Sequence, residues 1–75
     1  MIHFESLVNL ILAVKALIQE GHKEISISGE PHQLADLGIQ LNNCAISATT
    51  SQLICKVDSD SFLKILELKK LRNGN

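Results

Sequence analysis

The spacing of apolar residues alternates along this chain between the period of a helix and the period of two that a strand shows. In 75 residues, 45% of them hydrophobic, this alternation predicts short helices and short strands that share one core. A chain of this length buries only roughly 60% of the surface that its unfolded form exposes, which leaves no room for a second core. We therefore expect one α+β domain that spans residues 1–75.

The first helix is predicted from about Ser6 to Glu20, with Ser6 or Glu5 at its start and Gly21 where a helix commonly ends in a left-handed residue. Val8 and Leu12 lie one turn apart on a second ridge beside Lys15, so a helix packed on one side would leave them in water. The stripe that we expect to face the core consists of Leu7, Leu10, Ile11, Val14, Leu17 and Ile18.

Two segments with alternating apolar and polar residues flank this helix. The first, Met1 to Glu5, is too brief to decide whether it forms a strand. The second, Glu24 to Ser28, predicts a strand with one core face and one polar face.

Pro31 suits the first position of a helix, and we expect a second helix from there to about Asn42. Gly38 interrupts this helix, which a close approach of helix and sheet would explain. Its predicted packing face consists of Leu34, Ala35, Leu37 and Leu41.

From Cys44 to Val57 the period changes to two, which predicts an antiparallel hairpin. If its turn is centred between Thr49 and Thr50, Cys44 lies directly opposite Cys55, whereas a shift by one residue leaves the cysteines diagonal. The register, and with it the ability of the cysteines to pair, stays open. With this centring, the core face carries Cys44, Ile46, Ala48, Leu53, Cys55 and Val57, and the opposite face carries Ser47, Thr49, Gln52, Ile54 and Lys56.

The third helix is predicted to begin at Asp58-Ser59-Asp60, whose side chains can accept hydrogen bonds from free amides, and to end near Arg72. Residues 73–75 are expected to form a frayed end. Six apolar residues wrap more than half of this helix and give it surplus apolar surface: Phe62, Leu63, Ile65, Leu66, Leu68 and Leu71.

These elements predict a two-layer fold in the order helix, strand, helix, hairpin, helix. A small three-stranded sheet would pack on the helices. Its core residues would be Ile25, Ile27, Ile46, Leu53, Cys55 and Val57.

The charge of the chain argues against nucleic acid as a partner, because the formal net charge is −1 and no basic field is present. The apolar run from Leu7 to Ile18 is too short for a membrane span, which needs roughly twenty residues. It also lacks a positively charged segment before it and a small-residue cleavage site after it, as a secretory signal would have. We therefore expect a cytoplasmic protein whose two cysteines are buried thiols.

No motif for catalysis, metal binding or a cofactor stands out. His3, His22 and His32 lie at separate element boundaries, without the spacing of a zinc site. A nucleophile also needs a base and an oxyanion site in a pocket, and a thin two-layer domain offers a poor one. We expect no enzyme activity, no metal and no cofactor, and we interpret the segment Ser28 to Pro31 as a turn rather than an anion site.

The segment Glu24 to Leu37 reads EISISGEPHQLADL, a strand that ends in Ser-Gly followed by a leucine-rich helix that starts with proline. It resembles the opening of small bacterial immunity proteins, which neutralise polymorphic toxins, and the resemblance extends to Val57. It implies a cytoplasmic α+β protein that acts by occluding a partner. It carries no binding residue over to this chain.

The surplus apolar surface favours a protein-binding module over an enzyme. We expect the contact to involve Val8, Leu12, Lys15, Leu68 and Leu71. The alternative is a structural homodimer that uses the same helices for assembly. A small metal-binding or enzymatic domain is a third possibility, which the spacing of the residues does not favour.

Overall fold

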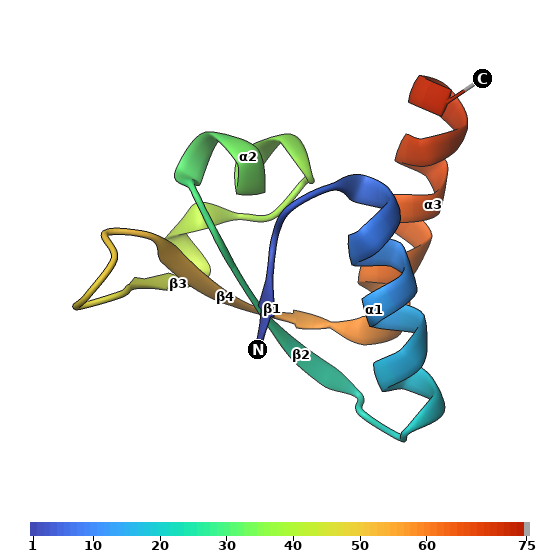
Figure 1. Ribbon diagram of the computed structural model, residues 1–75, viewed down its shortest axis with the longest axis horizontal. Helices are drawn as coiled ribbons and strands as arrows, with labels where there is room; N and C mark the ends of the chain where they lie inside the picture. Colours follow the sequence, from blue (N-terminus) through green and yellow to red (C-terminus); the bar gives the residue numbers. More distant parts are fainter. Residues whose placement is uncertain (75) are drawn as a thin grey trace.

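Strands and helices alternate in the first half of the chain, and a hairpin and a long helix follow (Figure 1). The computed structural model describes residues 1–74 as an α+β domain. In chain order the elements are β1 (Ile2–His3), α1 (Leu7–Gln19), β2 (Glu24–Gly29), α2 (Pro31–Asp36), the short 3-10 helix η1 (Leu41–Asn43), β3 (Cys44–Ile46), β4 (Leu53–Asp58) and α3 (Ser59–Gly74).

The sheet has four strands in the order β1-β2-β4-β3, so the expected three-stranded sheet is wrong. β1 runs parallel to β2, with Ile2 opposite Ile27, and the amide of Phe4 donates to the carbonyl of Ser28 at 2.8 Å. β4 is antiparallel to both of its neighbours, β2 and β3. The chain therefore passes from β2 to β3 across a gap that β4 fills later, which is a split β-α-β arrangement.

The predicted ends of α1 are confirmed. The side chain of Ser6 accepts a hydrogen bond from the amide of Asn9, and Gly21 follows the helix with φ +94°. The amides of Gly21 and His22 donate to the carbonyls of Ile18 and Leu17, the two bonds that close a helix in a Schellman motif. The expected stripe faces inward, with Leu10, Ile11 and Val14 buried and Leu7, Leu17 and Ile18 half-buried.

α2 ends at Asp36, well before the predicted end near Asn42. Gly38 is the reason, because it has φ +90° and occupies the left-handed position after the helix. The amides of Gly38 and Ile39 donate to the carbonyls of Ala35 and Leu34, so this end is a second Schellman motif. The predicted close approach at Gly38 is wrong: a Cβ there would lie 3.6 Å from Ile65, an ordinary contact.

The close approach of helix and sheet occurs at Gly29, at the end of β2. A Cβ there would lie 3.3 Å from Cδ2 of Leu34 and 3.4 Å from Cβ of Phe4. Of the predicted packing face, Leu34 and Leu37 are buried and Leu41 is half-buried, but Ala35 is exposed. The prediction for Ala35 is wrong because the short helix turns that side toward solvent.

The hairpin has the register with its turn centred between Thr49 and Thr50, since Cys44 pairs with Cys55. The two sulfurs form a disulfide, so the expected pair of free thiols is wrong. The period of two places the cysteines on one face but carries no information on their oxidation state. The expected burial of Ile46 is also wrong, because its side chain is 77% exposed.

Ile46 stays in solvent because β3 and the following turn extend from the side of the sheet farthest from α1 and α3 (Figure 1). Ala48, also expected on the core face, is exposed in this turn. Leu53 and Val57 are half-buried, and Cys55 is fully buried.

α3 begins at Ser59, directly after β4, and extends through Asn73 and Gly74. The expected frayed end is therefore wrong for these two residues, and Asn75 lies outside the described residues. Of the six apolar residues that wrap α3, Phe62 and Leu66 are buried and Leu63 is half-buried.

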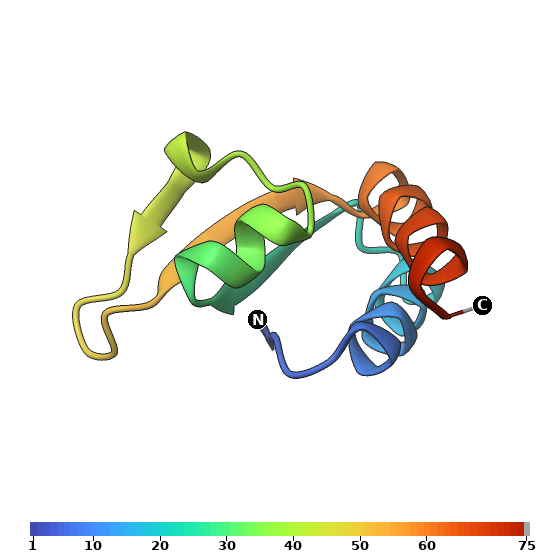
Figure 2. The ribbon, with the colours of Figure 1, turned by 90° about the horizontal axis from the view of Figure 1, so that it is seen from above.

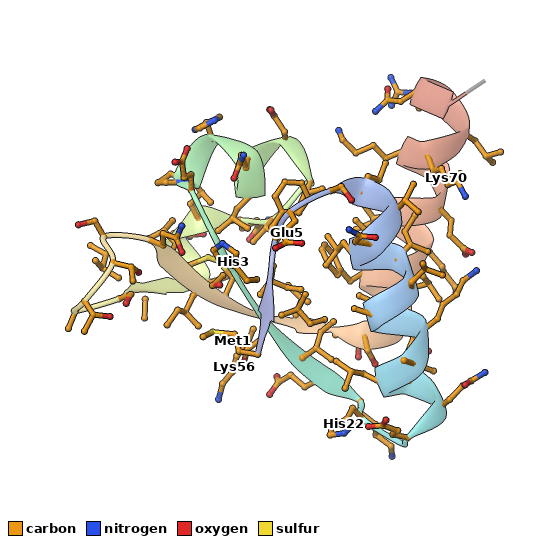
Figure 3. The ribbon with its side chains drawn as sticks, in the orientation of Figure 1. Met1, His3, Glu5, His22, Lys56 and Lys70 are labelled. Carbon is orange, nitrogen blue, oxygen red and sulfur yellow. A yellow bond between two sulfur atoms is a disulfide. The ribbon has the colours of Figure 1, made fainter. Side chains whose placement is uncertain are left out.

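α1 and α3 lie side by side and run in opposite directions, while α2 lies apart from them (Figures 1 and 2). The core fills the space between the helices and one face of the sheet, where Ile25, Ile27 and Cys55 are buried. Met1 and Lys56 point to the opposite side, away from all three helices (Figure 3). The domain thus has a covered sheet face and an open one.

Candidate functional site

Four large apolar side chains on the paired helices are more than half exposed, and a fifth, Ile65 on α3, is 44% exposed. Val8 is 52%, Leu12 60%, Leu68 62% and Leu71 75% exposed. Val8 and Leu12 are one turn apart on α1, and Leu68 and Leu71 are one turn apart on α3, so each helix presents a neighbouring pair. We call these four residues the helix-pair face.

An ion pair links α1 and α3 at the surface. Nζ of Lys15 on α1 lies 3.4 Å from Oε2 of Glu67 on α3, and both side chains are about half exposed. Leu12 lies almost one turn before Lys15, and Leu71 about one turn after Glu67. Because α1 and α3 run in opposite directions (Figure 1), Leu12 and Leu71 both lie on the same side of this ion pair along the helix pair.

The helix-pair face has basic surroundings. Four of the seven Lys and Arg residues of the chain lie on α3, namely Lys64, Lys69, Lys70 and Arg72, against the acidic residues Asp60 and Glu67. Glu67 is paired with Lys15. Within residues 1–74, no ion pair involves any of the four basic residues of α3. A surface that combines apolar side chains with such basic ones favours contact with an apolar surface that carries carboxylates.

All five residues expected to bind a partner therefore lie on α1 or α3. Val8, Leu12, Leu68 and Leu71 present exposed apolar groups on the two packed helices. Lys15 differs from them because its ammonium group faces Glu67. It therefore joins the two helices through a surface ion pair, a contact that contributes little stability by itself.

A pocket of about 280 Å³ lies beside the part of β4 that β3 does not cover. Its size is at the lower limit of pockets that bind small molecules. Its charged lining residues are Lys56 and Asp58, and Asp58 is engaged at the start of α3. The remaining lining residues are Gly38, Ile39, Gln40, Asn43, Cys55, Val57, Ser61, Phe62 and Ile65.

Asp58 caps α3. Its Oδ2 accepts a hydrogen bond of 2.9 Å from the amide of Ser61, and this bond, together with one from the Ser61 hydroxyl, lowers the pKa of Asp58. The carboxylate is therefore occupied as a helix cap, in the role that the sequence predicts for Asp58-Ser59-Asp60.

The open sheet face contains a histidine and a serine in contact. Nδ1 of His3 lies 2.9 Å from Oγ of Ser28, which is 6% exposed. A serine nucleophile also requires a group that orients the histidine, and none of the ion pairs among residues 1–74 involves His3. We interpret the contact as the link that fixes β1 beside β2. Sequence reasoning missed it because it depends on the pairing of β1.

The other two histidines lie at the surface, next to carboxylates of their own segments. His22 lies 3.5 Å from Glu20, and His32 lies 3.5 Å from Glu30. Within residues 1–74, no group of three or more His, Cys, Asp and Glu side chains could hold a metal ion. No helix in this part of the chain combines the length and the apolar character that crossing a membrane requires.

Comparisons with models of known protein families, with curated proteins and with solved structures found no match. The resemblance of Glu24 to Val57 to immunity proteins therefore stays a prediction from the sequence. Function has to be argued from the surfaces of the domain, and the helix-pair face is the surface with the most exposed apolar side chains.

Proposed function

We propose that this chain is a non-enzymatic protein-binding module and that the helix-pair face is its contact surface. The observation that carries this proposal is the exposure of four large apolar side chains on two helices that pack against each other. Apolar side chains scattered singly over a surface are ordinary, but two neighbouring pairs on adjacent helices form the kind of patch that partners cover.

The chemistry of the surface specifies the partner. An amphipathic helix or a similar convex surface would place its apolar side chains against Leu12 and Leu71. Carboxylates beside those side chains would lie near Lys64 and Arg72. The partner is therefore an apolar surface bordered by acidic residues.

A homodimer through the same surface is the alternative. Two copies would each bring the basic half of α3 into the interface, and like charges brought together in an interface oppose association. The excess of basic over acidic residues on α3 thus favours a different protein as the partner.

We further propose that the module acts as a bacterial inhibitor or immunity-type protein in the cytoplasm, by occluding the surface of its partner. The support for this class is the resemblance of the segment Glu24 to Val57. The disulfide bears on the proposed cytoplasmic location. The cytoplasm is a reducing compartment, and disulfides in such a compartment are usually transient.

The test is capture from the source cells with matched variants. The wild-type chain, the double variant Leu12→Asp/Leu71→Asp and the control Ile46→Asp are immobilised, and retained proteins are quantified by mass spectrometry. Ile46 is a fair control because it is as exposed as Leu71 and more exposed than Leu12, but lies on β3, away from the helix pair. We expect one protein retained in stoichiometric amount by wild type and control, and at least about tenfold less by the double variant.

Light scattering after chromatography separates the remaining outcomes. A particle of twice 8.2 kDa without a second protein would favour the homodimer. Equal retention of the same protein by all three variants would show that the helix-pair face is not the contact surface.

A further inference from the structure

We infer that the Cys44–Cys55 disulfide is a thiol–disulfide exchange site, which a dithiol attacks at Sγ of Cys44, and that reduction releases β3 from β4. The two cysteines lie opposite each other on adjacent antiparallel strands, with their Cα atoms 4.3 Å apart. The bond therefore links the edge strand of the sheet directly to its neighbour.

The two sulfurs lie in unequal surroundings. Cys55 is 1% exposed and belongs to the core, whereas Cys44 is half-buried at the start of the edge strand. Sγ of Cys44 lies 3.6 Å from the carbonyl oxygen of Gln40, in an exposed part of the surface. A thiolate attacks one sulfur along the axis of the S–S bond, from the side opposite the leaving sulfur. An attack on Cys44 therefore comes from solvent beyond the free edge of β3, whereas an attack on Cys55 would have to come through the sheet. Access therefore selects Cys44.

β3 has little to hold it apart from this bond. The strand has three residues and pairs with β4 alone. The side chains of Ala45 and Ile46 are exposed, so they contribute little buried apolar area. The backbone pairing of Ala45 with Ile54 and the bond of 2.7 Å from the Ser47 amide to the Gln52 carbonyl complete the attachment.

The exchange takes place in two steps. One thiolate of the dithiol bonds to Sγ of Cys44, the S–S bond breaks, and Sγ of Cys55 leaves as a thiolate that takes up a proton. In the mixed disulfide, the second thiolate of the dithiol then attacks the dithiol sulfur that is bonded to Sγ of Cys44. The S–S bond between them breaks, and Cys44 leaves as a thiolate. Two electrons pass to the protein, which gains two thiols, and the dithiol becomes a cyclic disulfide.

Reduction changes what the sheet presents to solvent. The Cys44 thiol can donate to the carbonyl of Gln40, a residue of its own segment rather than of β4. Once β3 leaves, β4 becomes the edge of the sheet, and the backbone groups of Ile54 lose their partners on Ala45. The reduced domain thus offers a strand edge that can pair with another chain, continuous with the pocket beside Lys56.

The test uses the native chain, with glutathione as the first probe. After brief treatment and blocking of free thiols, peptide mapping locates the glutathione adduct. We expect it on Cys44, with Cys55 blocked as a free thiol, and comparable adducts on both cysteines in concentrated urea. An adduct mainly on Cys55 in the native chain, or free thiols in a chain purified without reductant, would overturn the inference.

Hydrogen exchange measures the release of β3. With dithiothreitol, we expect the exchange of the Ser47 and Ile54 amides to accelerate roughly tenfold or more beyond that of Ile27 in β2, which accelerates only as far as the lower global stability of the reduced chain requires. The variant Cys44→Ala/Cys55→Ala should exchange fast at the same two amides with and without dithiothreitol. The inference fails if β3 keeps its protection after reduction, or if the exchange of Ile27 accelerates by as large a factor as that of Ser47 and Ile54.

Discussion

The hydroxyl of Ser59 donates a hydrogen bond of 2.8 Å to the main-chain carbonyl of His22. The amide of Ser59 also donates to the carbonyl of Lys23, at 3.0 Å. One buried residue at the start of α3 thus holds the turn between α1 and β2, and this junction sets α1 and α3 beside each other.

Replacing this serine should therefore destabilise the domain. In Ser59→Ala the carbonyl of His22 loses its partner at a partly buried site, and we expect a loss of about 1–2 kcal/mol in the free energy of unfolding. Urea unfolding followed by circular dichroism measures it. Ser26→Ala is the matched control, since Ser26 is half-buried and its hydroxyl has no hydrogen bond among residues 1–74; it should cost less than about 0.5 kcal/mol. Equal losses of unfolding free energy in both variants would show that the hydrogen bond from Ser59 to His22 does not stabilise the domain.

The two glycines that end α1 and α2 should respond alike to alanine. Gly21 and Gly38 have φ of +94° and +90°, and an added Cβ would meet nothing within 4 Å at Gly21 and only Ile65 at 3.6 Å at Gly38. The cost is therefore one of backbone conformation, about 1 kcal/mol or more for each alanine. Asparagine, which tolerates the left-handed region, should cost less at both positions. A much larger loss for Gly38→Ala than for Gly21→Ala would show that packing also contributes at Gly38.

The disulfide should raise the stability of the whole domain. The two cysteines are 11 residues apart, and closing a loop of this length stabilises a folded chain by about 2–3 kcal/mol. Urea unfolding of the wild type with and without dithiothreitol measures the difference. The double variant Cys44→Ala/Cys55→Ala should give the same midpoint under both conditions, and a wild type that is equally insensitive would contradict the prediction.

Because Asp58 caps α3, the stability of the folded chain should decrease at acidic pH. The hydrogen bonds from Ser61 lower the pKa of Asp58 in the folded chain from its ordinary value of 3.8. Because the pKa of Asp58 is lower in the folded chain than in the unfolded chain, the charged carboxylate stabilises the fold. This stabilisation is complete at pH values above the pKa of Asp58 in the unfolded chain. It is lost as the pH falls through the pKa of Asp58 in the folded chain. Asp58→Asn keeps a capping side chain but has no charge to titrate. The difference in Tm between wild type and Asp58→Asn should therefore shrink as the pH falls below about 4, and a difference that stays constant from pH 6 to pH 2 would contradict this account.

The elements with local signals could be predicted from the sequence. Ser6 and Gly21 mark the ends of α1 in the sequence itself, and the symmetric pattern around Thr49 and Thr50 contains the observed register of the hairpin. The exposure of Val8 and Leu12 also followed from local spacing, because neither lies on the buried stripe.

The features that depend on distant partners could not be predicted. β1 forms a strand because β2 lies beside it, and Lys15 pairs with Glu67 because α1 and α3 pack antiparallel. Alternation assigns Ile46 to a face, but it does not show that no helix reaches that end of the sheet. Gly38 could have been read as the end of α2, since a glycine after a short leucine-rich helix has this role more often than that of an interior residue.

The pairing of Cys44 with Cys55 also has a use in engineering. The disulfide fixes the pairing register of β3 and β4 at one residue pair, so the turn 47–52 is not needed to set that register. That turn lies at the far end of the domain from the helix pair (Figure 1). A peptide epitope or a fluorophore-binding sequence inserted between Ala48 and Ser51 would thus be displayed on a covalently closed stem, with the helical surface left free.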